Sequence, residues 1–355
     1  MKRKFIAFVV YHPTLFLLDR EAHYHFWPCM AMLELWYEVE MVGFTHGVKI
    51  ENDPNYDPRI RIVYKNSTIA SLWYIWKNRD AVVYINTFVL PSLLMWMVTK
   101  KSIFFGHESV FASEYSPHYR LKRWIVKLCY PFFTKIRVIN QHDKEWLKKE
   151  WFWEKGVVIP LVISEKNRKE TIYPDANILM LWHIVFPKKD PMTMILALEI
   201  VIKKYPNIKI YQVGENTHSK NTEGKHFEEI LYERGIHKNF TLYGKRKEGL
   251  RELDLPTSIY INSSLQEWQC IAVYDAALLG NALCLSDISS FRSILDNNLR
   301  LHPVWNFEKL AENILWYIEH PEDREEHIRM NQEWIHKHHN YEYIKKRIQQ
   351  EFNLL

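Results

Sequence analysis

Short apolar runs recur along the first half of the sequence and alternate with longer segments in which apolar residues return at helical spacing. The runs are typical of buried strands, and the intervening segments are long enough for helices. This alternation predicts a parallel sheet covered by helices. The predicted strands are residues 5–11, 39–44, 60–64, 81–85, 102–105 and 136–139, and the predicted helices include residues 20–36 and 119–133.

A polar stretch at residues 164–175 interrupts this pattern and predicts a linker, after which a second series of strands and helices begins. Asp190 and Pro191 are typical of a helix start, as capping residue and first helical residue. The last segment, residues 308–355, reads as helical. Two doubly wound domains in tandem are therefore expected. The predicted elements of the second domain are strands 178–181, 208–213, 240–243, 258–261 and 282–285, helices 192–205 and 227–234, and a helix that contains Asp275.

Composition agrees with two domains, because 355 residues exceed the roughly 250–300 at which single hydrophobic cores stop growing. The net charge of +5 permits an anionic ligand or membrane surface, and no long basic run or recognition motif indicates nucleic acid. The four cysteines form no C-x-x-C pair, which argues against a zinc site and a disulfide framework and favours the cytoplasm. No apolar run reaches the about 18 residues of a membrane span.

Two carboxylates stand eight residues apart in the apolar stretch L-Q-E-W-Q-C-I-A-V-Y-D-A-A-L-L-G, Glu267 just after a predicted strand and Asp275 within the next helix. Ligands of parallel sheets collect where strands end and helices begin. Eight helical residues span about 12 Å, which would let one carboxylate meet a sugar and the other a ribose, with a diphosphate on the amides of Gln269 and Cys270. The alternative interpretation gives neither residue a ligand: Glu267 is an acid at a helix N-terminus, where the dipole favours it, and Asp275 is an exposed helical residue.

The order of motifs around this stretch resembles the retaining glycosyltransferases of family four, which have the GT-B fold. The matching pieces are L-W-H-I-V-F-P-K-K-D, K-K-Y-P-N-I-K-I-Y-Q-V-G-E, F-T-L-Y-G, S-L-Q-E-W-Q-C-I-A-V-Y-D-A-A-L-L-G-N-A-L and H-P-E-D-R, with S-I-F-F-G-H-E and V-V-I-P-L-V-I in the first half. The resemblance implies two Rossmann-like domains facing a cleft. It assigns residues 1–168 to acceptor binding, residues 169–335 to nucleotide-sugar binding, and residues 336–355 to a helix that packs back towards the N-terminal domain.

By position, the resemblance implies that Glu267 contacts the donor sugar's hydroxyls, that Asp275 contacts the ribose, and that Lys188 or Lys189 neutralises the diphosphate. His107 would face the transferred sugar. The implied catalytic residues are thus His107, Glu267 and Lys189. The implied donor-binding residues are His183, Lys188, Lys189, Gly244, Gln269, Cys270 and Asp275.

No metal site is expected, because the chain has neither Asp-x-Asp nor His-Glu-x-x-His. His336, His338 and His339 have no acidic or cysteine partner at ligand spacing, so they are interpreted as a solvated stretch of the final helix. The nucleotide sugar, a UDP- or GDP-sugar, is then a co-substrate, and no other cofactor is expected.

The resemblance implies a retaining, metal-independent hexosyltransferase of glycan biosynthesis that acts on a hydroxyl acceptor, a growing glycan or a lipid-linked molecule. Basic and aromatic faces of residues 119–133 and 93–101 fit peripheral contact with an anionic membrane at its inner face, or packing on the sheet. A sugar-nucleotide epimerase shares this architecture. A noncatalytic partner subunit is a further alternative, because Trp268 and Gln269 stand where the family has glycines.

Overall fold

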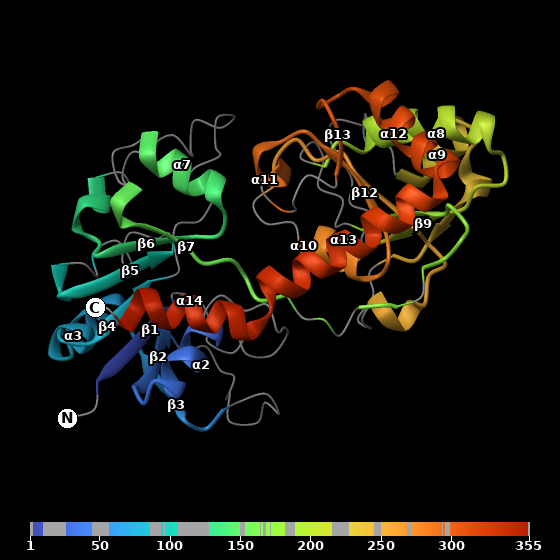
Figure 1. Cartoon of the computed structure of the whole chain (residues 1–355). Helices are drawn as coiled ribbons and strands as arrows, with labels where there is room; N and C mark the ends of the chain where they lie inside the picture. The colour runs from blue at the N-terminus through green and yellow to red at the C-terminus, as the bar shows by residue number, and fades with distance from the viewer. Residues whose placement is uncertain are drawn as a thin grey trace. The chain divides into compact units, whose positions relative to one another are not determined.

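The protein is described here from a computed structural model. Contacts within the chain divide it into two compact units, unit 1 (Met1–Ser164 with His338–Leu355) and unit 2 (Glu165–Lys337) (Figure 1). Each unit holds one parallel sheet. The structure describes residues 3–9, 26–44, 57–85, 94, 97–105, 128–149, 153–163, 165, 168–170, 172–181, 189–214, 227–244, 250–267, 271–292, 294 and 299–353.

Unit 1 is built on a seven-stranded sheet in which every described pairing is parallel. Six of its strands confirm the apolar runs of the sequence. The seventh, the three-residue run Gly-Val-Val close to Pro160, was not predicted. In sheet order the strands are β3 (Ile60–Lys65), β2 (Glu38–Phe44), β1 (Lys4–Val9), β4 (Val82–Ile85), β5 (Lys101–Phe105), β6 (Lys135–Val138) and β7 (Gly156–Val158).

Helices cover this sheet and include the end of the chain. The C-terminal helix lies along α2 (Figure 1), and Phe352 inserts into the core, with ring centroids 6.3 Å from Phe5 and 5.9 Å from Tyr84. The described end of the predicted helix 119–133 closes in a 3-10 turn. Among the described residues of unit 1, the helices are α2 (Phe26–Glu34), α3 (Thr68–Lys77), α7 (Gln141–Lys149) and α14 (Tyr341–Asn353), and the 3-10 turns are Tyr130–Phe132 and Trp153–Lys155.

The interpretation of the three C-terminal histidines as solvated is wrong for His339. This residue is buried, and its Nδ1 lies 2.8 Å from the carbonyl oxygen of Leu161. Val162 and Ile163, which follow Leu161, are buried as well, and the Ile163 amide donates to the His339 carbonyl at 3.0 Å. Burial lowers the pKa of His339 to about 4.

Unit 2 is built on a six-stranded parallel sheet. Five of its strands, β8 to β12, confirm the strands predicted for the second domain. The strand at one edge was missed because Arg-Leu-His is short and carries polar residues on both sides. In sheet order the strands are β10 (Phe240–Leu242), β9 (Ile210–Val213), β8 (Ile178–Leu181), β11 (Ile259–Asn262), β12 (Ala282–Ser286) and β13 (Arg300–His302).

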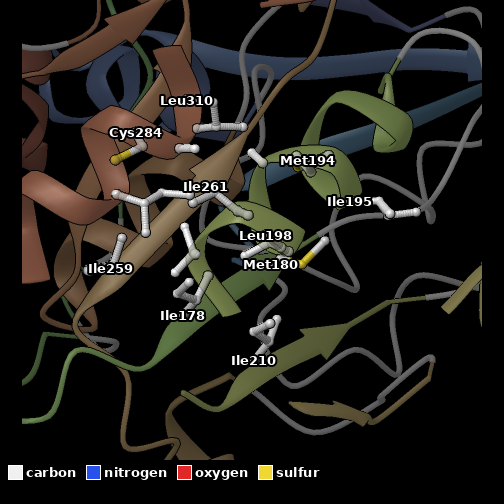
Figure 2. Close-up of a cluster of buried hydrophobic side chains, with 14 of the residues drawn as sticks. Ile178, Met180, Met194, Ile195, Leu198, Ile210, Ile259, Ile261, Cys284 and Leu310 are labelled. Atoms are coloured by element: carbon white, nitrogen blue, oxygen red, sulfur yellow. The ribbon is translucent and has the colours of Figure 1, made fainter. Parts of the chain in front are cut away.

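The core of unit 2 lies between this sheet and its helices. Figure 2 shows side chains of β8 and β11, Ile178 and Ile261 among them, packed with Met194 and Leu198 of α8. The C-terminal segment is helical as predicted, and it forms the three helices α12, α13 and α14. The helices described in this half of the chain are α8 (Pro191–Lys204), α9 (Phe227–Glu233), α10 (Ile271–Leu278), α11 (Ser289–Arg292), α12 (Phe307–Glu319) and α13 (Pro321–His339), and the described 3-10 turns are His237–Asn239 and Leu250–Leu253.

Two local signals explain where helices begin. Asp190 caps α8, its side chain accepting a hydrogen bond from the Thr193 amide at 3.4 Å, and Pro191 takes the first helical position as predicted. Pro321 opens α13 and thereby ends the run of α12. Within the described part of the chain, no helix combines the length and the apolar character needed to cross a membrane.

Candidate functional site

The order of strands in unit 2 creates a switch point between β8 and β11. From β8 the chain adds β9 and β10 on one side, and then returns to place β11 on the other side of β8. The connections that leave β8 and β11 therefore diverge at the carboxyl edge of the sheet. In open parallel sheets this is where ligands bind. Lys189 and Asp190 follow β8, and residues 263–267 follow β11.

An ion pair joins these two connections. The ammonium group of Lys189 donates to Oε1 of Glu267, although 78 residues separate them in the sequence. Only 14% of the Lys189 side chain and 6% of the Glu267 side chain are exposed. Placing two charges where water is largely excluded costs desolvation energy, and a hydrophobic pair would avoid that cost. A buried pair at a switch point is thus a candidate for function rather than for stability.

Serine hydroxyls hold the carboxylate and the loop that carries it. Ser264 Oγ donates to Glu267 Oε1 at 2.6 Å, and Ser286 Oγ, at the end of β12, donates to the Ser264 carbonyl at 2.5 Å. Asn262 accepts from the Ser264 amide through Oδ1 at 2.8 Å. These bonds orient Glu267 before any ligand arrives, which lowers the cost of ordering it on binding.

The two connections are also tied through the start of α8. Ser263 Oγ donates to the Asp190 carbonyl at 2.5 Å, and Thr193 Oγ1 donates to Asp190 Oδ2 at 2.6 Å. Asp190 has a φ of 39°, in the left-handed region, and burial raises the pKa of its carboxyl. The Lys189 side chain is therefore anchored on a short, tightly bonded turn.

Sequence reasoning missed the contributions of Ser263, Ser264 and Ser286. The available signal was polarity directly after an apolar strand, since Asn262-Ser263-Ser264 follows Ile261 and Ser286 follows Leu285. Polar side chains at such positions lie at the ligand-binding edge of a parallel sheet.

The structure places two further predicted residues on unit 2. Gly244 follows β10 with a φ of 62°, and its carbonyl accepts from the Gly214 amide at 2.9 Å beside the end of β9. Asp275 lies within α10 as predicted and is partly buried. Among the described residues, no group of three or more His, Cys, Asp or Glu side chains is placed to hold a metal ion. The predicted residues outside the described parts of the chain are His107, His183, Lys188, Gln269 and Cys270.

No protein-family model matches the sequence, and no curated protein matches it. Solved structures do match over the whole chain. Sucrose-phosphate synthase from Thermosynechococcus elongatus is 14% identical, with a TM-score of 0.78 and 99% of each chain covered. HepE from Anabaena in complex with UDP and glucose is 14% identical, with a TM-score of 0.74, 99% of this chain and 100% of that chain covered.

A glycosyltransferase from Rickettsia africae is 12% identical, with a TM-score of 0.75 and 99% of each chain covered. At such identities the likeness establishes the arrangement of the backbone. The seven-stranded and six-stranded parallel sheets, with their helices, match these neighbours over the full chain. The chain has the GT-B fold.

Proposed function

We propose that the protein is a retaining, metal-independent glycosyltransferase that moves a hexosyl group from a nucleotide sugar to a hydroxyl acceptor. The observation that carries this proposal is the buried Lys189–Glu267 pair at the switch point of unit 2. It combines a cation suited to a diphosphate with a carboxylate suited to sugar hydroxyls, since a carboxylate accepts two hydrogen bonds.

The donor we propose is a UDP-sugar. Structures of HepE hold UDP with glucose and UDP-glucose, and HepE shares the fold of this chain. In the proposed complex the ammonium of Lys189 pairs with the diphosphate instead of with Glu267. The Glu267 carboxylate then accepts hydrogen bonds from the hydroxyls of the hexose. Asp275, on α10, is proposed for the ribose. The family resemblance adds His183, Lys188, Gly244, Gln269 and Cys270 to donor binding and His107 to the transferred sugar.

In the reaction, the bond between the anomeric carbon and the diphosphate oxygen breaks, and the acceptor oxygen bonds to the anomeric carbon on the same face. A phosphate oxygen of the leaving group takes the proton of the acceptor hydroxyl. Negative charge grows on the diphosphate as it leaves, so Lys189 stabilises the transition state more than the ground state. This scheme requires no metal ion.

We propose that the acceptor is a growing glycan or a lipid-linked molecule. We also propose that the protein is located in the cytoplasm. The location rests on the cysteine pattern, in which Cys29 and Cys284 are buried thiols. Burial raises the pKa of both thiols, which keeps them in the unreactive protonated form.

Slow donor hydrolysis tests the proposal without a known acceptor. The purified protein is incubated with UDP-glucose, other UDP-sugars and GDP-sugars, with and without a chelator, and released nucleotide is measured together with calorimetric binding. The expected result is hydrolysis of at least one donor, unchanged by the chelator. Lys189→Met and Glu267→Gln should each lower the rate at least about a hundredfold, the loss typical of removing one transition-state contact.

A matched control is Lys204→Met, which removes a lysine of the same unit that pairs with Glu319 on the surface. It should leave hydrolysis unchanged. Full activity of either site variant would refute the assignment of these residues. If no donor is hydrolysed and none binds, the chain is a noncatalytic subunit. A free isomerised sugar nucleotide as product identifies an epimerase.

A further inference from the structure

Helix α3 of unit 1 is apolar on the side that faces water as well as on the side that faces the sheet. Its sequence is T-I-A-S-L-W-Y-I-W-K, in which Lys77 is the only charged residue. Ile75 packs in the core of unit 1, with Leu72 and Tyr74 against the same cluster. A surface helix normally turns polar residues outwards. Packing within unit 1 therefore does not explain why the outer side of α3 is apolar.

The outer side carries a stripe of exposed apolar residues. Ile69, Trp73 and Trp76 are spaced four and three residues apart, so they share one face. Their exposed fractions are 79%, 55% and 44%. The two indole rings stack on each other with centroids 4.8 Å apart, and the ammonium of Lys77 lies 5.2 Å from the Trp73 ring. The stripe is therefore an ordered, preformed surface.

The segment of sequence that contains this stripe is positively charged. Residues 65–101 contain five cations, which are Lys65, Lys77, Arg79, Lys100 and Lys101, and one acid. Their net charge of +4 accounts for most of the +5 of the whole chain.

The tertiary structure joins these charges to the helix. The Lys100 amide donates to the Arg79 carbonyl at 3.1 Å, and its ammonium pairs with Asp80, the one acid, at 2.6 Å. Three residues earlier, Met97 is 63% exposed. The end of α3 and the start of β5 thus present apolar and cationic side chains together.

We propose that the outer side of α3, the α3 surface (Ile69, Trp73, Trp76 and Lys77), binds the anionic phospholipid surface of a membrane. Tryptophan favours the boundary between headgroups and acyl chains, where its ring is apolar and its N–H is wet. Cations next to such side chains are drawn to anionic headgroups. The concentration of the chain's net charge at this one segment selects an anionic surface over a neutral apolar partner. The proposal does not depend on sugar transfer.

Co-sedimentation with vesicles tests it. The full chain is mixed with phosphatidylcholine vesicles with or without phosphatidylglycerol, in the absence of nucleotide sugar. It should sediment with the anionic vesicles and be released by high salt, because exposed charges are screened. Trp73→Ala/Trp76→Ala should weaken the association about tenfold or more, since it removes the side chains that enter the interface. Lys77→Gln/Arg79→Gln should weaken the preference for anionic vesicles, because it removes two of the five cations of this segment.

The matched control is Trp305→Ala, which removes a tryptophan of unit 2 that is 63% exposed. It should bind vesicles like the parent, and circular dichroism should show that all variants are folded. The proposal is overturned if the parent ignores anionic vesicles, or if the double tryptophan variant binds them equally well. It is also overturned if light scattering finds a dimer that this variant converts to monomer, since α3 would then bind a second copy of the chain.

Discussion

Removing one partner of the Lys189–Glu267 pair should destabilise unit 2 far more than removing both. In Lys189→Met, the Glu267 carboxylate stays buried with the Ser264 hydroxyl but without the ammonium. Leaving one charge of a buried pair uncompensated typically costs about 3–5 kcal/mol of the free energy of unfolding. Because Ser264 still donates at 2.6 Å, the expected loss is at the low end, about 3 kcal/mol.

Glu267→Gln should cost a similar amount, since it leaves the Lys189 ammonium without its carboxylate in a setting where 14% of that side chain is exposed. The double variant, Lys189→Met/Glu267→Gln, removes both charges. Replacing a whole buried pair is often nearly neutral, so its loss should be about 1 kcal/mol or less. The double-mutant cycle then gives a coupling of about 5 kcal/mol, which is above the range of about 0.5–3 kcal/mol usual for residues in contact.

Urea unfolding at fixed pH and salt, followed by circular dichroism and tryptophan fluorescence, measures these free energies. Lys204→Met measures the loss in the free energy of unfolding for an exposed pair, because 55% of the Lys204 side chain and 38% of the Glu319 side chain are exposed. Exposed pairs contribute about 0–1 kcal/mol. Additive losses in the cycle, or single-variant losses no larger than that of Lys204→Met, would refute the view that the site holds a desolvated ion pair.

Two further outcomes are expected. Burial raises the pKa of Asp143 in α7 to about 7, so between about pH 4 and pH 7 the native state keeps a proton that the unfolded chain has released, and stability falls as pH rises. Asp143→Asn should therefore gain about 2–4 kcal/mol relative to the parent between pH 5 and pH 8 in urea titrations; a constant difference would contradict this. Trp305 has a φ of 63°, where glycine is unstrained, so Trp305→Gly should raise stability by about 0.5–1 kcal/mol and raise the melting temperature; a lower melting temperature would show that the indole ring contributes more than the strain costs.

The strands could be predicted from the sequence because a strand buried on both faces is a short continuous apolar run, and such a run is visible without knowledge of its neighbours. The same logic explains the omissions. β13 reads Arg-Leu-His, in which polar residues flank one leucine, and β7 is the three-residue run Gly-Val-Val close to Pro160, so neither stands out as a strand. They are strands because a neighbouring strand supplies hydrogen bonds, in β13 through the register of Leu301 with Leu285.

Helix α3 shows what the sequence could not predict, which is the exposure of its two faces. Its propensity and its Ser67 cap are local, but exposure is not. The sequence T-I-A-S-L-W-Y-I-W-K reads as a buried helix, and only the packed sheet shows that Ile75 turns inwards while Trp73 and Trp76 face water. A surface of this kind cannot be separated from core by periodicity when both faces are apolar.

By itself the sequence determined the alternation of strands and helices, the cap of α8 at Asp190, and the position of Glu267 after a strand, because these depend on residues within one or two turns of each other. The tertiary structure decided which connections meet. Lys189 and Glu267 become partners because β11 returns to the side of β8. Ser264, which follows β11, donates to the carboxylate, and Ser286, at the end of β12, holds the Ser264 carbonyl. Such contacts arise from the order of strands in the sheet, which is set by the packing of the whole unit.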